Sequence, residues 1–320
     1  MSKPVNIPRV ALLIDQSRAY ERKLMAGIAR YIQLHGPWRL YHVSPLYVSG
    51  QKQFSVKDLT KWAPDGIIVR ETFFSKRLLE LDVPVFYSAY DKVIADLPGI
   101  YANSTRIAQM GADYFINKGY RNFAFCSLEG YYWSEDRKKV YIQYLQEKGF
   151  GCFFYDHPRH SSKNGWQEEP LRIASWLRSL PKPLALMTAT DELSLQVVEA
   201  AKIADLMIPE EIALLGVDND EALCNTTFPT LSSIDQNPEW AGFEVARILD
   251  KMMNGKLKKK TDVIADPLRV VTRHSTDILA ISDTRVASAL HFINEQARDR
   301  AVSVEEVARH TGLSRRMLEI

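Results

Sequence analysis

The chain has 320 residues, of which 46% are hydrophobic, so it can bury a substantial core, and a disordered or fibrous protein is excluded. Charged residues make up 25%, but the formal net charge of +2 excludes a protein that binds a polyanion with its whole surface. Any contact with nucleic acid is therefore regional.

The cysteines and the apolar segments indicate the cellular compartment. Cys126, Cys152 and Cys224 lie far apart, without Cys-x-x-Cys or Cys/His spacing, so we expect neither a metal site nor a disulfide framework. The N-terminal segment lacks the apolar run of a signal peptide, and no later segment is long enough for a membrane helix. We therefore expect a cytoplasmic protein, and a periplasmic solute receptor is disfavoured.

Short apolar runs alternate with amphipathic stretches from Arg9 onward. The first series predicts strands at 9–15, 38–44, 65–70 and 83–89, with helices at 20–36, 55–64 and 75–84. The second series predicts helices at 105–120, 134–150, 168–182 and 191–209, with strands at 122–128, 151–156, 183–190 and 211–220. Short apolar strands that each follow a helix are typical of parallel strands in βαβ units. The sequence therefore predicts an α/β fold with two successive parallel-sheet lobes.

Two later elements, a helix at 238–256 and an extended segment at 262–276, can return to cover the earlier sheets. After residue 276 the alternation stops and the pattern becomes helical. We therefore expect a domain over residues 1–280, followed by an all-α segment over 281–320. Within the domain we expect a first lobe of residues 9–103 plus 235–256 and a second lobe of residues 104–234 plus 257–276.

Polar side chains follow several predicted strands, where open parallel sheets bind their ligands. Asp191, Asp218 and Asn219 come directly after apolar runs, and Arg137 lies in "EGYYWSEDR" after another. Carboxylates, amides and a guanidinium can all hydrogen-bond hydroxyl groups, and the rings of Trp133 and Tyr20 can cover the apolar face of a sugar. The pattern favours a polyol ligand.

Structural roles remain open for the same residues. Asp191 and Asp218 lie near helix starts, where Asp often caps, Arg137 could lie on an exposed helix surface, and Trp133 could cover core beneath a loop. Phosphate-binding glycine loops, nucleophile elbows and His-Glu-x-x-His motifs are absent from the sequence. We therefore expect no enzyme activity, cofactor or metal.

The segment "SVEEVARHTGLSRRMLEI" at 303–320 is typical of two short helices joined by a tight turn. Val304 and Val307 are expected to pack inward, and Gly312 to permit the turn. An ordinary helical hairpin is the alternative to a DNA-reading motif. In the DNA-reading interpretation the contacts come from the start of the second helix, at Ser314, Arg315 and Arg316.

The stretches "DGIIV", "TATDE", "GVDND" and "LSSIDQNPEWAGFEVARIL" resemble the effector-binding domain of lactose-repressor-type regulators, which is related in fold to type I periplasmic sugar-binding proteins. The resemblance covers roughly residues 9–276. Residues 286–320 look like the beginning of an AraC-type DNA-binding domain. The combination is similar to xylose operon regulators of the XylR type, in which a sugar-binding domain precedes two AraC-type helix-turn-helix units.

The resemblance implies a transcriptional activator that binds a pentose such as D-xylose between its lobes and acts as a homodimer on DNA. It places the sugar contacts on Tyr20, Glu21, Trp133, Arg137, Asp191, Asp218 and Asn219. Because a full AraC-type domain is longer, the resemblance also implies a truncated domain, with specific DNA binding weak or lost. The alternative is an intracellular sugar-binding module or a sugar-acting enzyme on the same fold.

Overall fold

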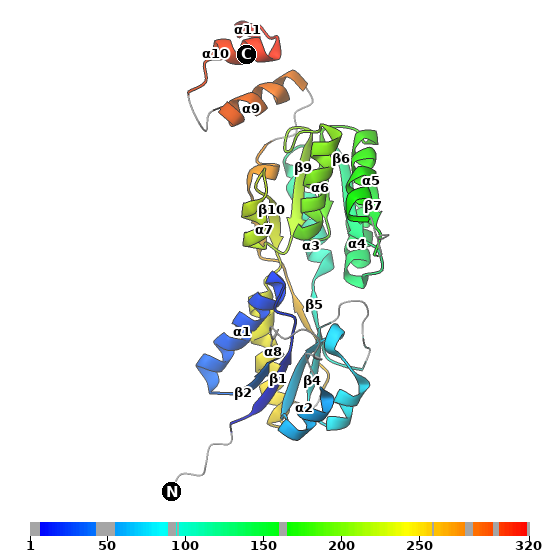
Figure 1. Ribbon diagram of the computed structural model, residues 1–320, viewed down its shortest axis with the longest axis vertical. Helices are drawn as coiled ribbons and strands as arrows, with labels where there is room; N and C mark the ends of the chain where they lie inside the picture. The colour runs from blue at the N-terminus through cyan, green and yellow to red at the C-terminus, as the bar shows by residue number, and fades with distance from the viewer. Residues whose placement is uncertain are drawn as a thin grey trace. The chain divides into compact units, whose positions relative to one another are not determined.

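The computed structural model describes residues 7–42, 55–88, 94, 96–159, 165–257, 259–278, 284–296 and 301–318 (Figure 1). The chain forms two compact units. The first unit comprises Met1–Arg106, Gly130–Trp133 and Gln236–Leu268, and the second comprises Ile107–Glu129, Ser134–Asp235 and Arg269–Ile320. Each unit is built on its own six-stranded sheet.

The sheet of the first unit is entirely parallel, in the order β11-β5-β4-β3-β1-β2. Its strands are β1 (Arg9–Leu13), β2 (Arg39–His42), β3 (Gly66–Arg70), β4 (Val85–Ser88), β5 (Gly99–Ala102) and β11 (Val263–Ala265). Its helices are α1 (Ala19–His35), α2 (Val56–Trp62) and α8 (Pro238–Met253), with 3-10 turns at Glu71–Phe73 and Lys76–Leu81.

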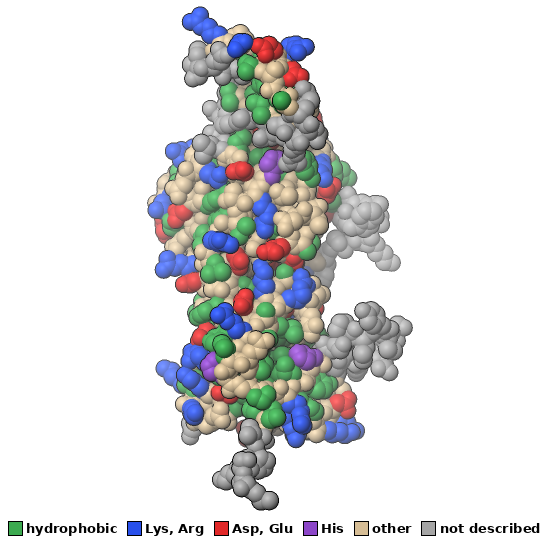
Figure 2. All heavy atoms as spheres, turned by 90° about the vertical axis from the view of Figure 1, so that its left-hand side faces the viewer, with side chains coloured by type: hydrophobic (Ala, Val, Ile, Leu, Met, Phe, Trp, Pro, Cys, Tyr) green, Lys and Arg blue, Asp and Glu red, His purple; other side chains and the backbone are tan. Residues whose placement is uncertain are grey.

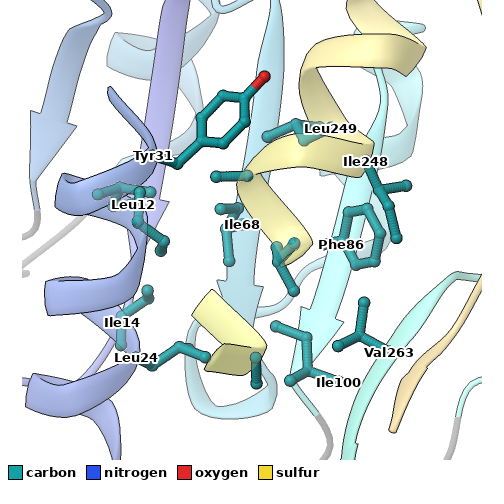
Figure 3. Close-up of a cluster of buried hydrophobic side chains, with 14 of the residues drawn as sticks. Leu12, Ile14, Leu24, Tyr31, Ile68, Phe86, Ile100, Ile248, Leu249 and Val263 are labelled. Atoms are coloured by element: carbon teal, nitrogen blue, oxygen red, sulfur yellow. The ribbon is translucent and has the colours of Figure 1, made fainter. Parts of the chain in front are cut away.

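The core of the first unit lies on both faces of this sheet because successive strand residues point to opposite faces. On one face, Leu24 of α1 and Leu249 of α8 pack over Ile68 and Phe86, as Figure 3 shows. On the other face, α2 and the second 3-10 turn pack over the alternate residues of β1 and β3. Burying each such aliphatic side chain stabilises the fold by about 1.5–3 kcal/mol.

The second unit has the sheet order β12-β10-β9-β8-β6-β7, parallel except where β12 runs antiparallel to β10. Its strands are β6 (Asn122–Leu128), β7 (Cys152–His157), β8 (Leu184–Thr188), β9 (Ile212–Val217), β10 (Ser232–Asp235) and β12 (Arg269–Val271). Its helices are α3 (Ser104–Asn117), α4 (Tyr132–Glu147), α5 (Gly165–Ser179), α6 (Asp191–Ala204) and α7 (Glu221–Thr226), and the first few residues of α3 and α4 belong to the first unit. The α/β fold class and the paired parallel sheets predicted from the sequence are confirmed.

Some local elements differ from the expectation. The sequence pattern missed β5, β10 and α7, which are only four, four and six residues long. Where a helix was expected at 75–84, Lys76–Leu81 form a 3-10 turn, and the last two residues of the strand expected at 38–44 lie outside the described residues. β11 pairs with β5 in the first sheet, whereas residues 257–276 were expected as a whole in the second lobe. Such short segments carry too little periodicity to show which sheet they join.

Within the described ranges, none of the helices is both long and apolar enough to span a membrane.

Candidate functional site

Asp191 is the first residue of α6 and follows β8 at its carboxyl end. Its side chain is completely buried. Oδ2 accepts a hydrogen bond from the backbone N–H of Asp220 at 2.8 Å, and Oδ1 accepts one from the Ser233 hydroxyl at 2.6 Å. The capping alternative is wrong for Asp191, because the side chain of Thr190 caps α6 by accepting from Leu193 N–H. The carboxylate instead joins the start of α6 to the segment after β9 and to β10.

The pKa of Asp191 is raised to about 7, because the effect of burial is larger than that of the hydrogen bonds from Ser233, Asp220 and Cys224, which lower the pKa. The Cys224 thiol lies 3.5 Å from Oδ2. A carboxylate this deep in the protein is costly unless its oxygens are satisfied. Its protein donors provide that compensation.

Strand β9 comes so close to Asp191 that position 216 has room only for glycine. A Cβ added at Gly216 would lie 2.2 Å from Asp191 Oδ1, far inside van der Waals contact. We expect Gly216→Ala to lower the free energy of unfolding by about 2–4 kcal/mol, because it displaces the buried carboxylate from its donors. Chemical denaturation measures the loss. Gly151→Ala is the control, since no atom lies within 4 Å of its added Cβ, and equal losses in the two variants would contradict this explanation.

The loop after β9, Asp218–Asp220, adopts an unusual backbone conformation. Asp218 has φ 114° and Asn219 has φ 48°, and each such non-glycine conformation costs about 1–3 kcal/mol. The Asp218 N–H donates to Ile234 O at 3.0 Å, and the Asn219 N–H donates to the Ser233 hydroxyl at 2.9 Å. Asp220 then caps α7 by accepting from Ala222 N–H at 3.1 Å. The surrounding hydrogen bonds therefore fix the position of the half-buried Asp218.

Asn219 is buried, and its amide is engaged inside the second unit. Its Oδ1 accepts from Arg273 Nη2 at 2.9 Å, and its Nδ2 donates to Asp235 Oδ2 at 3.4 Å. Its amide thus links the loop that also carries Asp218 to Arg273 and to β10.

Arg137 lies on α4 and is only 2% exposed, so the alternative of an exposed helix surface is wrong. Its Nη1 donates to Ala189 O, two residues before Asp191, which brings the guanidinium to the carboxyl end of β8. Trp133, in the first turn of α4, is half-buried, with its ring centroid 5.8 Å from that of Tyr131.

The first unit has its own polar cluster at the carboxyl ends of β1 and β3. Glu21, in the first turn of α1, forms a buried ion pair with Arg70, the last residue of β3. Burial raises the pKa of Asp15, but the hydrogen bonds from Ser17 and the charge of Arg70 outweigh this and lower it overall. Tyr20 is half-buried beside Glu21. Arg70 was not among the site residues predicted from the sequence, although the strand "GIIVR" ends on this arginine.

The predicted sugar-site residues are thus divided between the units. Arg137, Asp191, Asp218 and Asn219 lie in the second unit, where hydrogen bonds join Asp191 and Asn219 to one loop. Tyr20, Glu21 and Trp133 lie in the first unit. Among the described residues, no group of three or more His, Cys, Asp and Glu could hold a metal ion.

Three helices follow at the C-terminus: α9 (Thr284–Gln296), α10 (Val304–Thr311) and α11 (Arg315–Leu318). Ser303 and Glu306 form a capping box that starts α10, and Gly312 ends it at φ 66°. Val307 is buried as expected, but the inward packing predicted for Val304 is wrong, because that residue begins the helix and is 39% exposed.

The candidate DNA-contacting residues Ser314, Arg315 and Arg316 are exposed at the start of α11. Arg315 Nη1 lies 2.9 Å from Glu305 Oε1 of α10, an exposed ion pair that anion contacts could replace. Basic and acidic side chains are interspersed over the face that Figure 2 shows, in keeping with the small net charge.

A family model described as a periplasmic binding protein-like domain matches residues 112–276, more than half of the chain. The chain belongs to the periplasmic binding protein-like family. The matched range contains Arg137, Asp191, Asp218 and Asn219.

Relatives of this periplasmic binding protein-like chain include xylose operon regulatory proteins from two organisms. The xylose operon regulatory protein of Haemophilus influenzae is 26% identical over 97% of this chain and 81% of its own length. That of Escherichia coli strain K12 is 24% identical over 97% of this chain and 80% of its own length. The solved structure of the xylose-binding transcription activator xylR has a TM-score of 0.79 at 23% identity, covering 98% of this chain and 81% of that one. The structural likeness shows a shared fold.

Proposed function

We propose that this protein is a cytoplasmic, sugar-responsive transcriptional regulator whose effector is a pentose such as D-xylose. The single observation that carries the proposal is the loop Asp218–Asp220, in which Asp218 and Asn219 have positive φ and the Asp220 N–H donates to the buried carboxylate of Asp191. Strained backbone held rigidly by its surroundings is typical of ligand sites. The similarity to xylose operon regulatory proteins over 97% of the chain supports the choice of effector and of regulation.

The side chains of the proposed site have different roles. In the second unit, Asp218 and Arg137 bind sugar hydroxyls, because a carboxylate accepts from hydroxyl groups and a guanidinium donates to them. Asp191 and Asn219, whose polar atoms already bond to protein groups, hold the loop in position. In the first unit, Glu21 and Arg70 supply further polar contacts. Tyr20 and Trp133 supply rings that cover the apolar face of the sugar.

The effector works by shifting a conformational equilibrium. A sugar favours one conformation of the protein by as much as its affinity for that conformation exceeds its affinity for the others. No bond is broken, so the protein is not an enzyme. DNA is contacted by Ser314, Arg315 and Arg316, and a homodimer presents paired reading helices to paired half-sites. The protein acts as an activator.

Binding of a pentose tests the proposal. Calorimetric titration of the chain with D-xylose is expected to show saturable binding. Asp218→Asn should weaken this binding tenfold or more, because a hydrogen bond to a charged group contributes about 1.5–3 kcal/mol. Asp205→Asn is the matched control: this exposed residue of the same unit also has positive φ, at 58°, and Asn tolerates that conformation. Equal effects in the two variants would count against a direct role for Asp218.

A sugar-acting enzyme would convert the sugar, whereas a regulator leaves it unchanged. Mass spectrometry after incubation with D-xylose is expected to recover the sugar unchanged. A product that accumulates with time, in proportion to the protein concentration, would show that the protein is an enzyme and would contradict the proposed function.

A further inference from the structure

Arg273 connects the candidate ligand loop to the end of the sugar-binding fold. Its guanidinium donates to three acceptors: Asn219 Oδ1 at 2.9 Å, Asn225 Oδ1 at 3.1 Å and Leu231 O at 2.9 Å. These acceptors lie in the loop after β9, in α7, and just before β10. One planar side chain thus holds together the pieces of chain that surround Asp218. The flat fork of donors makes this possible, and a lysine ammonium could not reproduce the geometry.

The backbone around Arg273 is also fixed to the second unit. Arg273 N donates to the Ser232 hydroxyl at 2.8 Å, and that hydroxyl lies 2.9 Å from Arg273 O. The Ser275 hydroxyl donates to Leu214 O at 2.6 Å, and the Thr276 hydroxyl lies 2.7 Å from the hydroxyl of Tyr114. Ser275 and Thr276 are completely buried. These hydrogen bonds tie the segment to β9, β10 and α3.

The same segment leads directly toward the C-terminal helices. After β12 the chain forms a 3-10 turn at His274–Thr276, and α9 begins at Thr284. Only a short stretch of sequence thus separates the Arg273 hydrogen bonds from the first of these helices. The Arg273 side chain therefore links Asn219 to the segment of polypeptide that leads to α9.

We propose that Arg273 is a positioning residue that couples sugar binding at the Asp218–Asp220 loop to the C-terminal helices. The proposal rests on the proposed function, since it takes the loop to be the effector-binding one. Coupling of this kind requires a contact that differs between the sugar-free and the sugar-bound protein. The three hydrogen bonds of Arg273 are that contact: a sugar that shifts the loop shifts Asn219 and Asn225, and the guanidinium follows them.

Hydrogen exchange of the whole chain, with and without saturating D-xylose, tests the coupling. We expect the sugar to change deuterium uptake in peptides that cover α9 to α11 in the wild type. Arg273→Lys, studied at a D-xylose concentration that its own calorimetric titration shows to be saturating, should lose at least half of that change. Asn225→Ala, which removes one acceptor, should lose a smaller part. Arg178→Lys is the matched control, because Arg178 donates to Ile203 O and Ala204 O of the same unit, away from the loop.

The outcomes separate this inference from the proposed function. If D-xylose binds but leaves α9 to α11 unchanged, or if Arg273→Lys keeps the full response, the coupling role is wrong and the sensor remains. If no pentose binds, the proposed function fails, and exchange without sugar still decides the coupling. In that case Arg273→Lys should raise uptake in peptides covering residues 212–226 and 284–296 together, and a rise in only one of them overturns the inference.

Discussion

Asp191→Ala is expected to lower the free energy of unfolding by roughly 3–5 kcal/mol, because two buried donors lose their acceptor at once. These donors are the Asp220 N–H and the Ser233 hydroxyl, and both hold the loop that carries Asp218. Asp191→Asn should cost clearly less. Its carbonyl can still accept from Asp220, and its amide can donate to the Ser233 hydroxyl, which can reverse its role. Urea denaturation of the three proteins measures both differences.

The stability difference between wild type and Asp191→Asn should also depend on pH. Burial raises the pKa of Asp191 from 3.8 to about 7 in the folded state. Between these two pH values the folded state holds a proton on Asp191 that the unfolded state has released. The stabilisation that this proton provides is therefore complete below about pH 4 and is lost as the pH rises to 7. The advantage of the wild type should therefore shrink by up to a few kcal/mol between pH 4 and pH 7, at about 1.4 kcal/mol per pKa unit.

These two expectations have separate contradicting results. Equal destabilisation by Ala and Asn would mean that the hydrogen bonds to Asp220 and Ser233 do not carry the effect. A difference from Asp191→Asn that stays constant across this pH range would mean that Asp191 titrates at its ordinary value when folded.

The second large effect is expected at the buried ion pair of the first unit. Glu21→Ala leaves the Arg70 guanidinium buried without its carboxylate, and such a change typically destabilises a protein by about 3–5 kcal/mol. The double variant Glu21→Leu/Arg70→Met removes both charges and should fold with nearly the stability of the wild type, since apolar replacement of a buried pair is often neutral. It should nevertheless lose D-xylose binding, because the polar groups of the first unit are gone.

Thermal denaturation and calorimetry of these variants distinguish structure from function. Glu244→Ala is the control, because Glu244 pairs with the more exposed Arg247 in the same unit, and such pairs contribute about 0–1 kcal/mol. If the double variant is stable and binds D-xylose like the wild type, Glu21 and Arg70 are structural only. If Glu21→Ala is as stable as Glu244→Ala, loss of the Glu21 carboxylate beside the buried Arg70 does not destabilise the fold as predicted.

Long periodic elements made the fold predictable. Strands such as β6 and β9 are continuous apolar runs, and helices such as α6 and α8 carry a clear apolar face, so the sequence indicated parallel sheets without further information. β5 and β10 could not be found this way, because four residues do not show a period. The sheet that β11 joins depends on tertiary pairing with β5, which no local pattern encodes.

The sequence showed where polar side chains follow strands, and the binding of a sugar by these side chains stays a prediction. Polar residues at strand ends pointed to Asp191, Asp218 and Asn219, but the sequence does not tell a ligand contact from a buried support. The structure shows that Asp191 is completely buried and that Asn219 bonds to Arg273, while the sugar contacts of these residues stay a prediction. Arg70 and Arg273 were missed because each depends on a partner more than forty residues away, Glu21 in one case and Asn219 in the other.

A crystal structure of the chain grown with saturating D-xylose tests the central claim most directly. The account predicts one sugar whose hydroxyls contact the Asp218 carboxylate and the Arg137 guanidinium, while Asp191 keeps its hydrogen bonds to Asp220 and Ser233. A sugar bound elsewhere, without contact to Asp218 or Arg137, would contradict the account, as would a structure without sugar at that concentration.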